Sequence, residues 1–339
     1  MAEPLLEVKD LKVHFPTEDG LVKAVDGISF SIAPGETLGV VGESGSGKSV
    51  TFLTLMGLIT RKHARIEGQA LYKGQDLLRI PAEELRHLRG EEVTMIFQDP
   101  LTALNPVLKV GFQIAEVFRA HQRISKKEAK ENAIELLARV GIPRPEERAR
   151  QYPHEFSGGM RQRAMIAMAL ALNPDLVIAD EPTTALDVTV QAQILDLLDR
   201  LKDEFNASVA LITHDLGVVA EHCNQIMVMY AGKVAEYGLA DDIYHNAHHP
   251  YTWGLLGSIA RLDLEGQERL RPIRGQPPSL IHVPPGCPFH PRCPYVMDIC
   301  KVEVPPFLPA DGHHGSACHL PLAEKERIFH EEVEVGAPV

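Results

Sequence analysis

The sequence lacks any run of about 18 apolar residues, so no segment is expected to cross a membrane as a helix. Its first ten residues, MAEPLLEVKD, also lack the basic stretch and apolar core of a signal peptide. We therefore expect the chain to remain in the cytoplasm unless a partner brings it to a membrane. An internal repeat and a low-complexity tract are missing as well, and we expect ordinary globular structure.

A basic surplus is also missing, because 46 acidic residues outnumber 34 Lys and Arg and give a net charge of −12. A protein with a large nucleic-acid footprint needs a basic face, so nucleic acid is not an expected partner. Cysteine is scarce, with five in 339 residues. In a reducing cytoplasm, metal binding or burial is a better default for them than disulfides. The length suits one large domain or two smaller ones.

Strands are predicted where short apolar or alternating runs are bounded by polar residues. Residues 5–15 and 23–32 alternate on either side of the turn-rich PTEDG, and residues 225–238 predict a hairpin that turns at Ala231–Gly232. Compact apolar runs are typical of buried strands in a mostly parallel sheet, and they occur at residues 37–41, 93–97, 176–179 and 209–213.

Two regions differ from this pattern. Between residues 98 and 157, charged residues recur at helical spacing, as in KKEAKENAIELLARV, which indicates a helical insert. Beyond about residue 250, prolines crowd residues 272–294, and four of the five cysteines lie between residues 287 and 318. We therefore expect the last part of the chain to be a separate small appendage.

The segment GESGSGKS fits the pattern of a phosphate-binding loop at every fixed position. Glycines let backbone N–H groups curl around phosphates, and the following helix points its positive end at them. Lys48 can reach the β- and γ-phosphates of ATP, and Ser49 can supply a hydroxyl to Mg²⁺. A plain glycine-rich turn would not require this Lys-Ser pair. The predicted ATP ligands are Gly42, Glu43, Ser44, Gly45, Ser46, Gly47, Lys48, Ser49 and Val50.

A second segment, LVIADE, is an apolar strand that ends in two acids. At a strand end beside the phosphate loop, Asp180 suits the role of organising Mg²⁺ and its waters. Glu181 lies one residue further, so it projects differently and can polarise the attacking water. A strand ending in Asp-Glu is a weak signal alone, but together with the phosphate loop it predicts hydrolysis.

The segment FSGGMRQR resembles the signature of ABC ATPases, usually written LSGGQ, although Met160 replaces the usual glutamine. A bare SGG would ordinarily indicate a flexible turn. The resemblance implies that Ser157, Gly158 and Gly159 open a helix whose N-terminus contacts ATP bound to the opposite subunit. Other positions match the family one by one: Gln98 linking Mg²⁺ to the insert, Asp187 in the interface loop Ala185–Asp187, His214 on the γ-phosphate, and Phe15 stacking on adenine, with His14 adjacent.

The resemblance implies an α/β fold of the P-loop ABC type, with a RecA-like, mostly parallel sheet core, an antiparallel β subdomain and a helical insert. We expect the ATPase domain over residues 1–250, its insert at about 99–160, and an extension over 251–339. The catalytic residues would be Lys48, Gln98, Glu181 and His214.

Further segments, such as QDPLTALNP and GCPFHPRCPY, resemble the ATPases of bacterial dipeptide and oligopeptide importers over essentially the whole chain. The four-cysteine tail resembles that of the D-type subunit. These importers imply a second, related ATPase, two transmembrane permease subunits and an extracytoplasmic solute-binding protein, with this chain peripheral on the cytoplasmic face of the inner membrane. Residues 99–106 are expected to receive a permease helix. Some relatives carry nickel or other small solutes, which leaves the cargo open.

Cys287, Cys293, Cys300 and Cys318 are separated by five, six and seventeen residues. Four thiolates can bind a 4Fe–4S cluster or a tetrahedral Zn²⁺, and four unliganded cysteines are the plain alternative. Neither zinc knuckles nor the common ferredoxin spacing is present, so it is the resemblance to the D-type tail that favours iron–sulfur. The remaining cysteine, Cys223, is expected to be a buried thiol. Surface positions are expected for His248, His249, His313 and His314.

Two other classes of function stay open. A soluble ABC protein acting on DNA or the ribosome would generally carry a long coiled coil or two cassettes, and neither is found here. A regulatory cassette without catalysis is disfavoured by the joint presence of Lys48, Glu181 and His214. The sequence therefore predicts an ATPase that powers transport through membrane partners.

Overall fold

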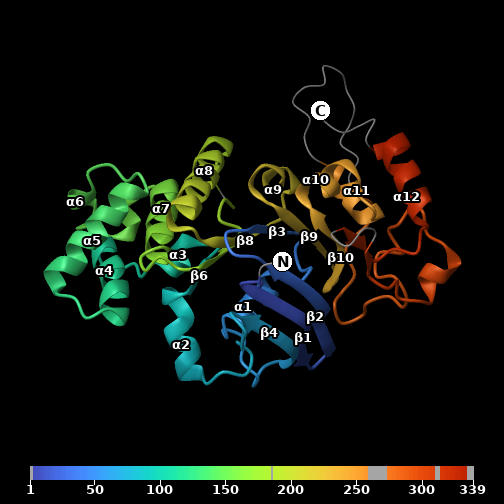
Figure 1. Ribbon diagram of the computed structural model, residues 1–339, viewed down its shortest axis with the longest axis horizontal. Coiled ribbons are helices and arrows are strands. Elements are labelled where there is room, and N and C mark those ends of the chain that lie inside the picture. Colours follow the sequence, from blue (N-terminus) through green and yellow to red (C-terminus); the bar gives the residue numbers. More distant parts are fainter. Residues whose placement is uncertain (1–2, 185, 259–272, 310–313, 334–339) are drawn as a thin grey trace, which may run out of the picture. The chain divides into compact units, whose positions relative to one another are not determined.

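A computed structural model describes residues 3–184, 186–258, 273–309 and 314–333 (Figure 1). By internal contacts the chain divides into two compact units. Unit 1 comprises Met1–Ile32, Thr37–Leu78 and Thr213–Val339, and unit 2 comprises Ala33–Glu36 and Arg79–Ile212. Each unit is described by itself.

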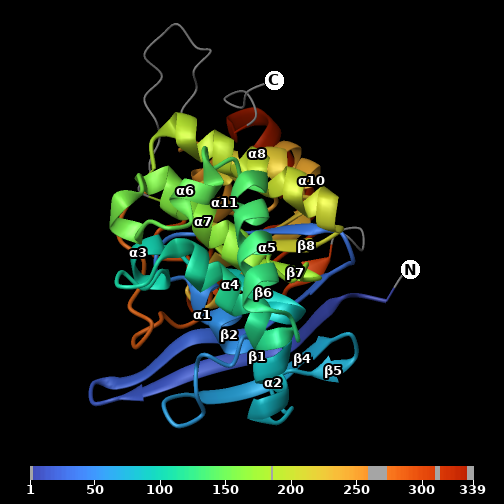
Figure 2. The ribbon, with the colours of Figure 1, turned by 90° about the vertical axis from the view of Figure 1, so that its left-hand side faces the viewer.

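Unit 1 contains a four-stranded antiparallel sheet in the order β2-β1-β4-β5 (Figure 2). The strands are β1 (Leu6–Thr17), β2 (Gly20–Ile32), β4 (Arg65–Tyr72) and β5 (Gln75–Asp76). The two strands predicted near the N-terminus are confirmed, and both are longer than expected because β1 and β2 remain paired as far as Thr17 and Gly20. One face of the sheet is buried, with Val8, Val13 and Ile28 almost inaccessible to solvent.

A second group of strands in unit 1 begins with β3 (Thr37–Val41), which runs parallel to β9 (Gln225–Tyr230). Antiparallel pairs then link β9 to β10 (Lys233–Leu239), β10 to β12 (Gly315–Ser316), and β12 to β11 (Leu308–Pro309). The predicted hairpin is confirmed. Its turn residues Ala231 and Gly232 have φ values of 47° and 79°, as the two-residue turn favoured between twisted strands requires.

The helices of unit 1 are short. They are α1 (Lys48–Leu55), α9 (Leu216–His222), α10 (Ala240–His245), α11 (Pro250–Leu256) and α12 (Leu322–Ile328), with a 3₁₀ turn at Asp298–Lys301 and a π-helical turn at Phe329–Val333. Helix α1 ends at Leu55, and Gly57 just beyond it takes a left-handed conformation with φ 62°.

Unit 2 combines three parallel strands with a helical insert. The strands β6 (Val93–Ile96), β7 (Leu176–Asp180) and β8 (Ser208–Thr213) are buried along their length, as predicted for a parallel sheet. The helices are α2 (Ala82–Glu91), α3 (Pro100–Ala103), α4 (Val110–His121), α5 (Lys126–Arg139), α6 (Pro145–Arg148), a 3₁₀ turn at Pro153–Glu155, α7 (Gly158–Ala169) and α8 (Val188–Phe205). Helices α4, α5 and α7 pack on one another, which confirms the insert (Figure 2).

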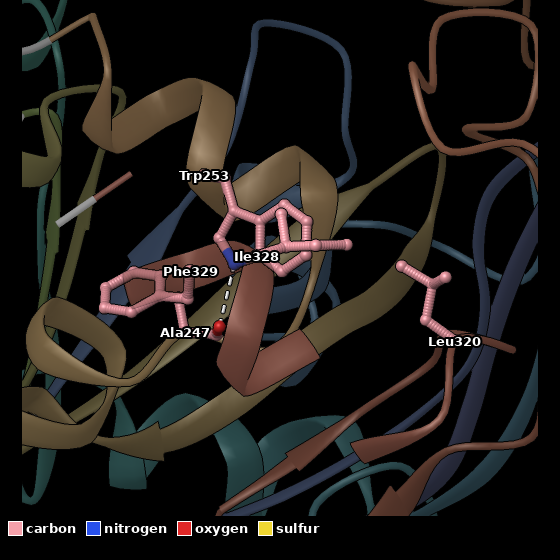
Figure 3. Close-up of a cluster of buried hydrophobic side chains, with 5 residues drawn as sticks. All are labelled: Ala247, Trp253, Leu320, Ile328 and Phe329. Carbon is pink, nitrogen blue, oxygen red and sulfur yellow. Dashed lines mark hydrogen bonds between the residues drawn. The ribbon is translucent and has the colours of Figure 1, made fainter. Parts of the chain in front are cut away.

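The described part of the tail belongs to the same compact unit as the phosphate loop, which differs from the separate appendage expected from the sequence. Strand β12 from the tail pairs with β10, and an apolar cluster joins Ala247 and Trp253 to Leu320, Ile328 and Phe329 (Figure 3). The Trp253 indole N–H donates to the Ala247 carbonyl at 2.7 Å. The sequence around the cysteines is poor in apolar residues, and α11 and α12 supply the missing core. The boundary at residue 250 between the ATPase domain and the extension remains a prediction.

None of the helices in the described ranges has the length and hydropathy needed to span a bilayer.

Candidate functional site

The predicted phosphate loop connects β3 to α1 in unit 1. All three of its glycines have positive φ, 150° at Gly42, 79° at Gly45 and 104° at Gly47. A Cβ atom at Gly42 would lie 2.2 Å from the Met229 carbonyl oxygen, and one at Gly47 would lie 2.2 Å from that of Ala24. Neighbouring backbone therefore presses against the outside of the loop, and only glycine permits this approach.

The inside of the loop offers groups suited to an anion. The Lys48 side chain is 5% exposed, and its amine donates to the carbonyls of Gly42 at 2.6 Å and Glu43 at 3.1 Å. The Ser46 hydroxyl is buried and has no hydrogen-bond partner among the described residues. Because α1 starts at Lys48, its N-terminus adds the positive end of a helix. An amine, a hydroxyl and a helix start fit the predicted binding of phosphate.

The other ligands predicted in unit 1 are less enclosed. The His14 Nε2 lies 3.0 Å from Asp26 Oδ1, and the Lys233 amine lies 3.1 Å from the other oxygen of Asp26. The ring of His14 is thus held by a carboxylate, and the half-buried Phe15 is the better candidate for stacking on a base. His214 is exposed and lies between β8 and α9.

Unit 2 brings two predicted catalytic residues together. Asp180 ends β7 and is 7% exposed, and Glu181 follows it with φ 46°. The Oε2 atom of Glu181 accepts hydrogen bonds from the Gln98 amide at 2.9 Å and the Thr184 hydroxyl at 2.8 Å. A left-handed glutamate is strained, and strain of this kind is concentrated at functional sites. Thr184 is a residue that sequence reasoning missed.

The signature segment starts a helix, as the resemblance implied. The Ser157 hydroxyl caps α7 by accepting from the Met160 N–H at 3.3 Å, and Ser157 and Gly158 are exposed. Asp187 caps α8 in the same way, accepting from Val190 at 3.0 Å, whereas Ala185 lies outside the described residues. The start of α7 is therefore open to an anion from another molecule.

The four predicted tail ligands line one small pocket. Cys287 and Cys300 are buried, Cys293 and Cys318 are half-buried, and all four are free thiols. Burial raises the pKa of Cys287 to about 11 and that of Cys293 to about 12, and it also raises the pKa of Cys318. At neutral pH these thiols hold their protons, so a metal must displace protons to bind. The spacing in sequence did not by itself predict that the four would converge.

The histidine prediction was wrong for the residues that can be described: His248 and His249 are each 3% exposed and His314 is 1% exposed, whereas His313 lies outside the described residues. They are buried because the Glu236 carboxylate accepts the N–H groups of His248 and His249, and His314 Nε2 lies 2.8 Å from it. The three ligand atoms of Glu236, His248 and His314 lie within 4.8 Å of one another. Both carboxylate oxygens already accept backbone N–H groups, and the His248 and His314 rings stack at 4.1 Å, which suits a structural cluster.

The thiol of Cys223 was predicted to be buried, and it is half-buried. It lies 3.0 Å from the position that a Cβ atom would take at Gly39, so β3 requires glycine there to accommodate α9 and this sulfur.

Comparison with known families gives two matches. The family described as "ABC transporter" matches residues 25–184, and "Oligopeptide/dipeptide transporter, C-terminal region" matches residues 235–300. The oligopeptide transport ATP-binding protein OppD of Salmonella typhimurium is 53% identical over 323 residues, which are 95% of this chain and 96% of that protein. The dipeptide transport ATP-binding protein DppD of Bacillus subtilis is 52% identical over 319 residues, 94% of this chain and 95% of that protein.

Solved structures give the same fold. The dimeric post-hydrolysis structure of the ATP-binding cassette MJ0796, bound to ADP and Pi, is 26% identical with a TM-score of 0.63 and covers 69% of this chain and 98% of that one. The cbiO1 protein of Clostridium perfringens, part of an ABC transporter complex, is 25% identical with a TM-score of 0.61 and covers 72% of this chain and 92% of that one. The predicted fold class is therefore confirmed.

Proposed function

The chain belongs to the ABC transporter ATPases of the oligopeptide and dipeptide transport type, and from this premise we propose that it powers import of dipeptides or oligopeptides. The observation that carries the proposal is the presence, in one chain, of a phosphate loop shaped for ATP and a C-terminal region typical of peptide transporters. ATP hydrolysis supplies the work, and the cargo is chosen by other subunits.

In the proposed reaction, ATP is held by the loop Gly42–Ser49, with Lys48 on its β- and γ-phosphates. Mg²⁺, when bound, neutralises phosphate charge, and Ser49, Gln98 and Asp180 are the residues that would hold it. Glu181 accepts a proton from water as the water oxygen bonds to the γ-phosphorus. The bond from that phosphorus to the bridging oxygen breaks, and ADP keeps the electron pair. His214 would contact the γ-phosphate.

The geometry of Glu181 supports its role as the base. Its Oε2 atom accepts hydrogen bonds from Gln98 and Thr184, which fixes the orientation of the carboxylate. A general base needs a fixed position within hydrogen-bond reach of the proton that it removes. Gln98 contacts Glu181 from the end of β6, and it would therefore connect the base to the helical insert that follows it.

The proposed motor needs a second ATPase. The exposed start of α7 at Ser157–Gly159 would contact the ATP bound to the other ATPase, and Asp187 would lie at the interface between them. We propose that the second ATPase is a related subunit and that two transmembrane permeases and an extracytoplasmic solute-binding protein complete the importer. The chain would then be peripheral on the cytoplasmic face of the inner membrane.

Apolar side chains near residues 99–106 support the proposed permease contact. In unit 2, Leu101 is 57% exposed, Val107 is 74% exposed and Phe112 is 48% exposed. Exposed apolar groups gathered in one region mark interaction sites. Replacing Leu101 and Val107 together by Asp should abolish copurification with the permeases and leave ATP binding intact. Val304→Asp, at a tail position that is 55% exposed, is the matched control.

We further propose that the four cysteines bind one 4Fe–4S cluster, with Zn²⁺ as the alternative. All four cysteines line one small pocket, which supports a ligand that they share. When bound, the cluster would cross-link four positions of a segment with few apolar residues and stabilise it.

The direct test of the function is reconstitution with the partner ATPase and the permeases in vesicles that are loaded with Mg-ATP, with the solute-binding protein added outside. Labelled di- and oligopeptides should be taken up only when ATP is present, and uptake should stop with Glu181→Gln. Uptake of Ni²⁺ with no response to peptides would refute the peptide assignment while keeping the motor. Absence of any ATP hydrolysis in the assembled complex would refute both.

A further inference from the structure

The phosphate loop and the cysteine tail are joined by an ion pair within unit 1. Arg292 donates from Nη1 to Oε2 of Glu43 at 2.5 Å and from Nη2 to Oε1 at 3.0 Å. The ion pair is bidentate, which is the geometry in which arginine binds a carboxylate most strongly. Arg292 is 5% exposed and Glu43 is 28% exposed, so the contact is mostly shielded from water and from screening ions.

The guanidinium of Arg292 has little freedom to move. Its Nε–H donates to the Arg274 carbonyl at 3.0 Å, and it lies 5.8 Å from the ring centre of Tyr230 and 6.0 Å from that of Phe289. Cation–π contacts and a carbonyl thus hold the charged group on sides that Glu43 leaves open. Arg292 is therefore fixed in position, and it holds Glu43 of the loop.

A second tail contact fixes the backbone of the same loop residue. The Glu43 N–H donates to the Tyr251 hydroxyl at 2.8 Å, and the Tyr251 ring packs on Tyr230 at 4.7 Å and on Phe289 at 5.4 Å. The side chain and the backbone of Glu43 are therefore both held by residues beyond position 250.

Arg292 adjoins the cysteine pocket along the chain, although its side chain does not line it. Arg292 precedes Cys293, and Phe289 lines the pocket with Cys287 and Cys293. Any change in the pocket that shifts the segment Cys287–Cys293 must also shift Arg292, because the two are covalently adjacent. A continuous path of contacts runs from the cysteines through Arg292 to the phosphate loop.

We propose that Arg292 is a positioning residue for the phosphate loop. Through Arg292, a shift of the segment Cys287–Cys293 changes the affinity of the loop for the nucleotide. The inference rests on the proposed ATPase function and deepens it. Glu43 carries a negative charge inside a loop that must receive phosphates. Arg292 draws that charge outward and neutralises it, which removes a repulsion from the ATP site and fixes the loop shape.

The first experiment measures equilibrium binding of Mg-ATP to the full chain by calorimetry. Arg292→Met should raise the Kd about tenfold to a hundredfold, the range for loss of hydrogen bonds to a charged group. Arg292→Lys keeps the charge but cannot make two parallel bonds, so its Kd should lie between the two. The control is Arg327→Met, which breaks only exposed pairs with Glu324 and Glu331 and should leave the Kd unchanged.

A double-mutant cycle separates positioning from general damage. Glu43→Gln should weaken binding like Arg292→Met, and the double variant should be no worse than either single variant, because both remove one interaction. If Arg292→Met does not fold, Arg292→Lys and Glu43→Gln carry the test. Unchanged or tighter ATP binding in folded variants would overturn the proposal. If the wild-type chain itself binds no ATP, the proposed function fails instead.

The second experiment tests the link to the cysteines from the other side. Coupling between two sites is reciprocal, so Mg-ATP must stabilise the cysteine pocket. Amide hydrogen exchange of the segment Cys287–Cys293, followed by peptide mapping, should slow at least about fivefold with Mg-ATP in the wild type. In Arg292→Met the nucleotide should have no effect on the rate. An equal slowing in both proteins would show that the coupling does not pass through Arg292.

Discussion

The phosphate loop and the cysteine tail are held in place by different kinds of contact. The loop is built by eight consecutive residues, and its key hydrogen bonds join residues only five or six positions apart, as between Lys48 and the carbonyls of Gly42 and Glu43. The tail has local hydrogen bonds as well, such as that from the Arg292 N–H to the Phe289 carbonyl at 2.9 Å, but they do not close its pocket. Its pocket depends on Cys318 returning to Cys287, and its apolar cluster on α12 returning to Trp253. The groups of the loop depend on a fixed spacing along the chain, whereas the contacts that stabilise the tail join residues far apart in the sequence.

Because the loop and the tail are held differently, we expect changes in the proposed catalytic residues to lower the rate of ATP hydrolysis. Changes in the tail should lower the affinity for ATP and the stability of the fold. The largest effect is expected for Glu181→Gln. ATP binding should persist, and hydrolysis should fall about 10²- to 10⁴-fold, because the base is lost while its hydrogen bonds to Gln98 and Thr184 can be kept.

The measurement for Glu181→Gln is phosphate release by the assembled complex, beside equilibrium binding of ATP. Glu131→Gln, an exposed residue that pairs only weakly with Lys127 at 3.9 Å, is the matched control in the same unit. A wild-type rate in Glu181→Gln would remove this residue from the mechanism and leave the strained backbone at position 181 without a catalytic reason.

The next largest effect concerns the completeness of the site. The isolated chain should hydrolyse ATP about a hundredfold more slowly than the assembled complex, since in the proposed motor part of the phosphate contacts comes from the signature segment of the second ATPase. Turnover per chain should rise with protein concentration and rise further when the partner ATPase is added. Full activity in a dilute monomer would contradict the shared site.

A smaller effect on Mg-ATP binding is expected when the cysteines are substituted. Changing any one of Cys287, Cys293, Cys300 or Cys318 to Ser should remove the brown colour and the content of about four irons per chain expected for the cluster. The tail should lose stability. Mg-ATP binding should survive, weakened only as far as Arg292 is displaced.

Anaerobic purification, metal analysis and thermal unfolding measure the cysteine prediction, with Cys223→Ser as the control outside the pocket. One zinc and no iron would exclude the cluster but keep a metal that stabilises the tail. If all four thiols of the wild type react freely with maleimide, both metals are excluded.

The sequence predicts local features of this molecule better than contacts between distant residues. The strands and the hairpin at Ala231–Gly232 were predictable because each depends on neighbours a few residues away, and the glycines of the loop were predictable from the fixed spacing of the phosphate-loop motif. The pair between Arg292 and Glu43 spans 249 positions, and nothing in either motif indicates the other. The burial of His248 and His314 was unpredictable for the same reason, since their carboxylate partner Glu236 lies on β10. The strained backbone of Glu181 has no sequence signal at all.

The smallest predicted effect isolates one hydrogen bond between the two regions. Tyr251→Phe removes the hydroxyl that accepts the Glu43 N–H and keeps the ring that packs on Tyr230 and Phe289. The loss of one neutral hydrogen bond is worth about 0.5–1.5 kcal/mol, so the Kd for Mg-ATP should rise roughly two- to tenfold. The matched control is Tyr244→Phe, because the Tyr244 hydroxyl also makes a hydrogen bond with the backbone, donating to the Leu216 carbonyl, but does not touch the loop. Both variants should lose similar stability on thermal unfolding, and only Tyr251→Phe should lose ATP affinity. Equal affinities in the two variants would mean that the tail supports the loop through Arg292 alone.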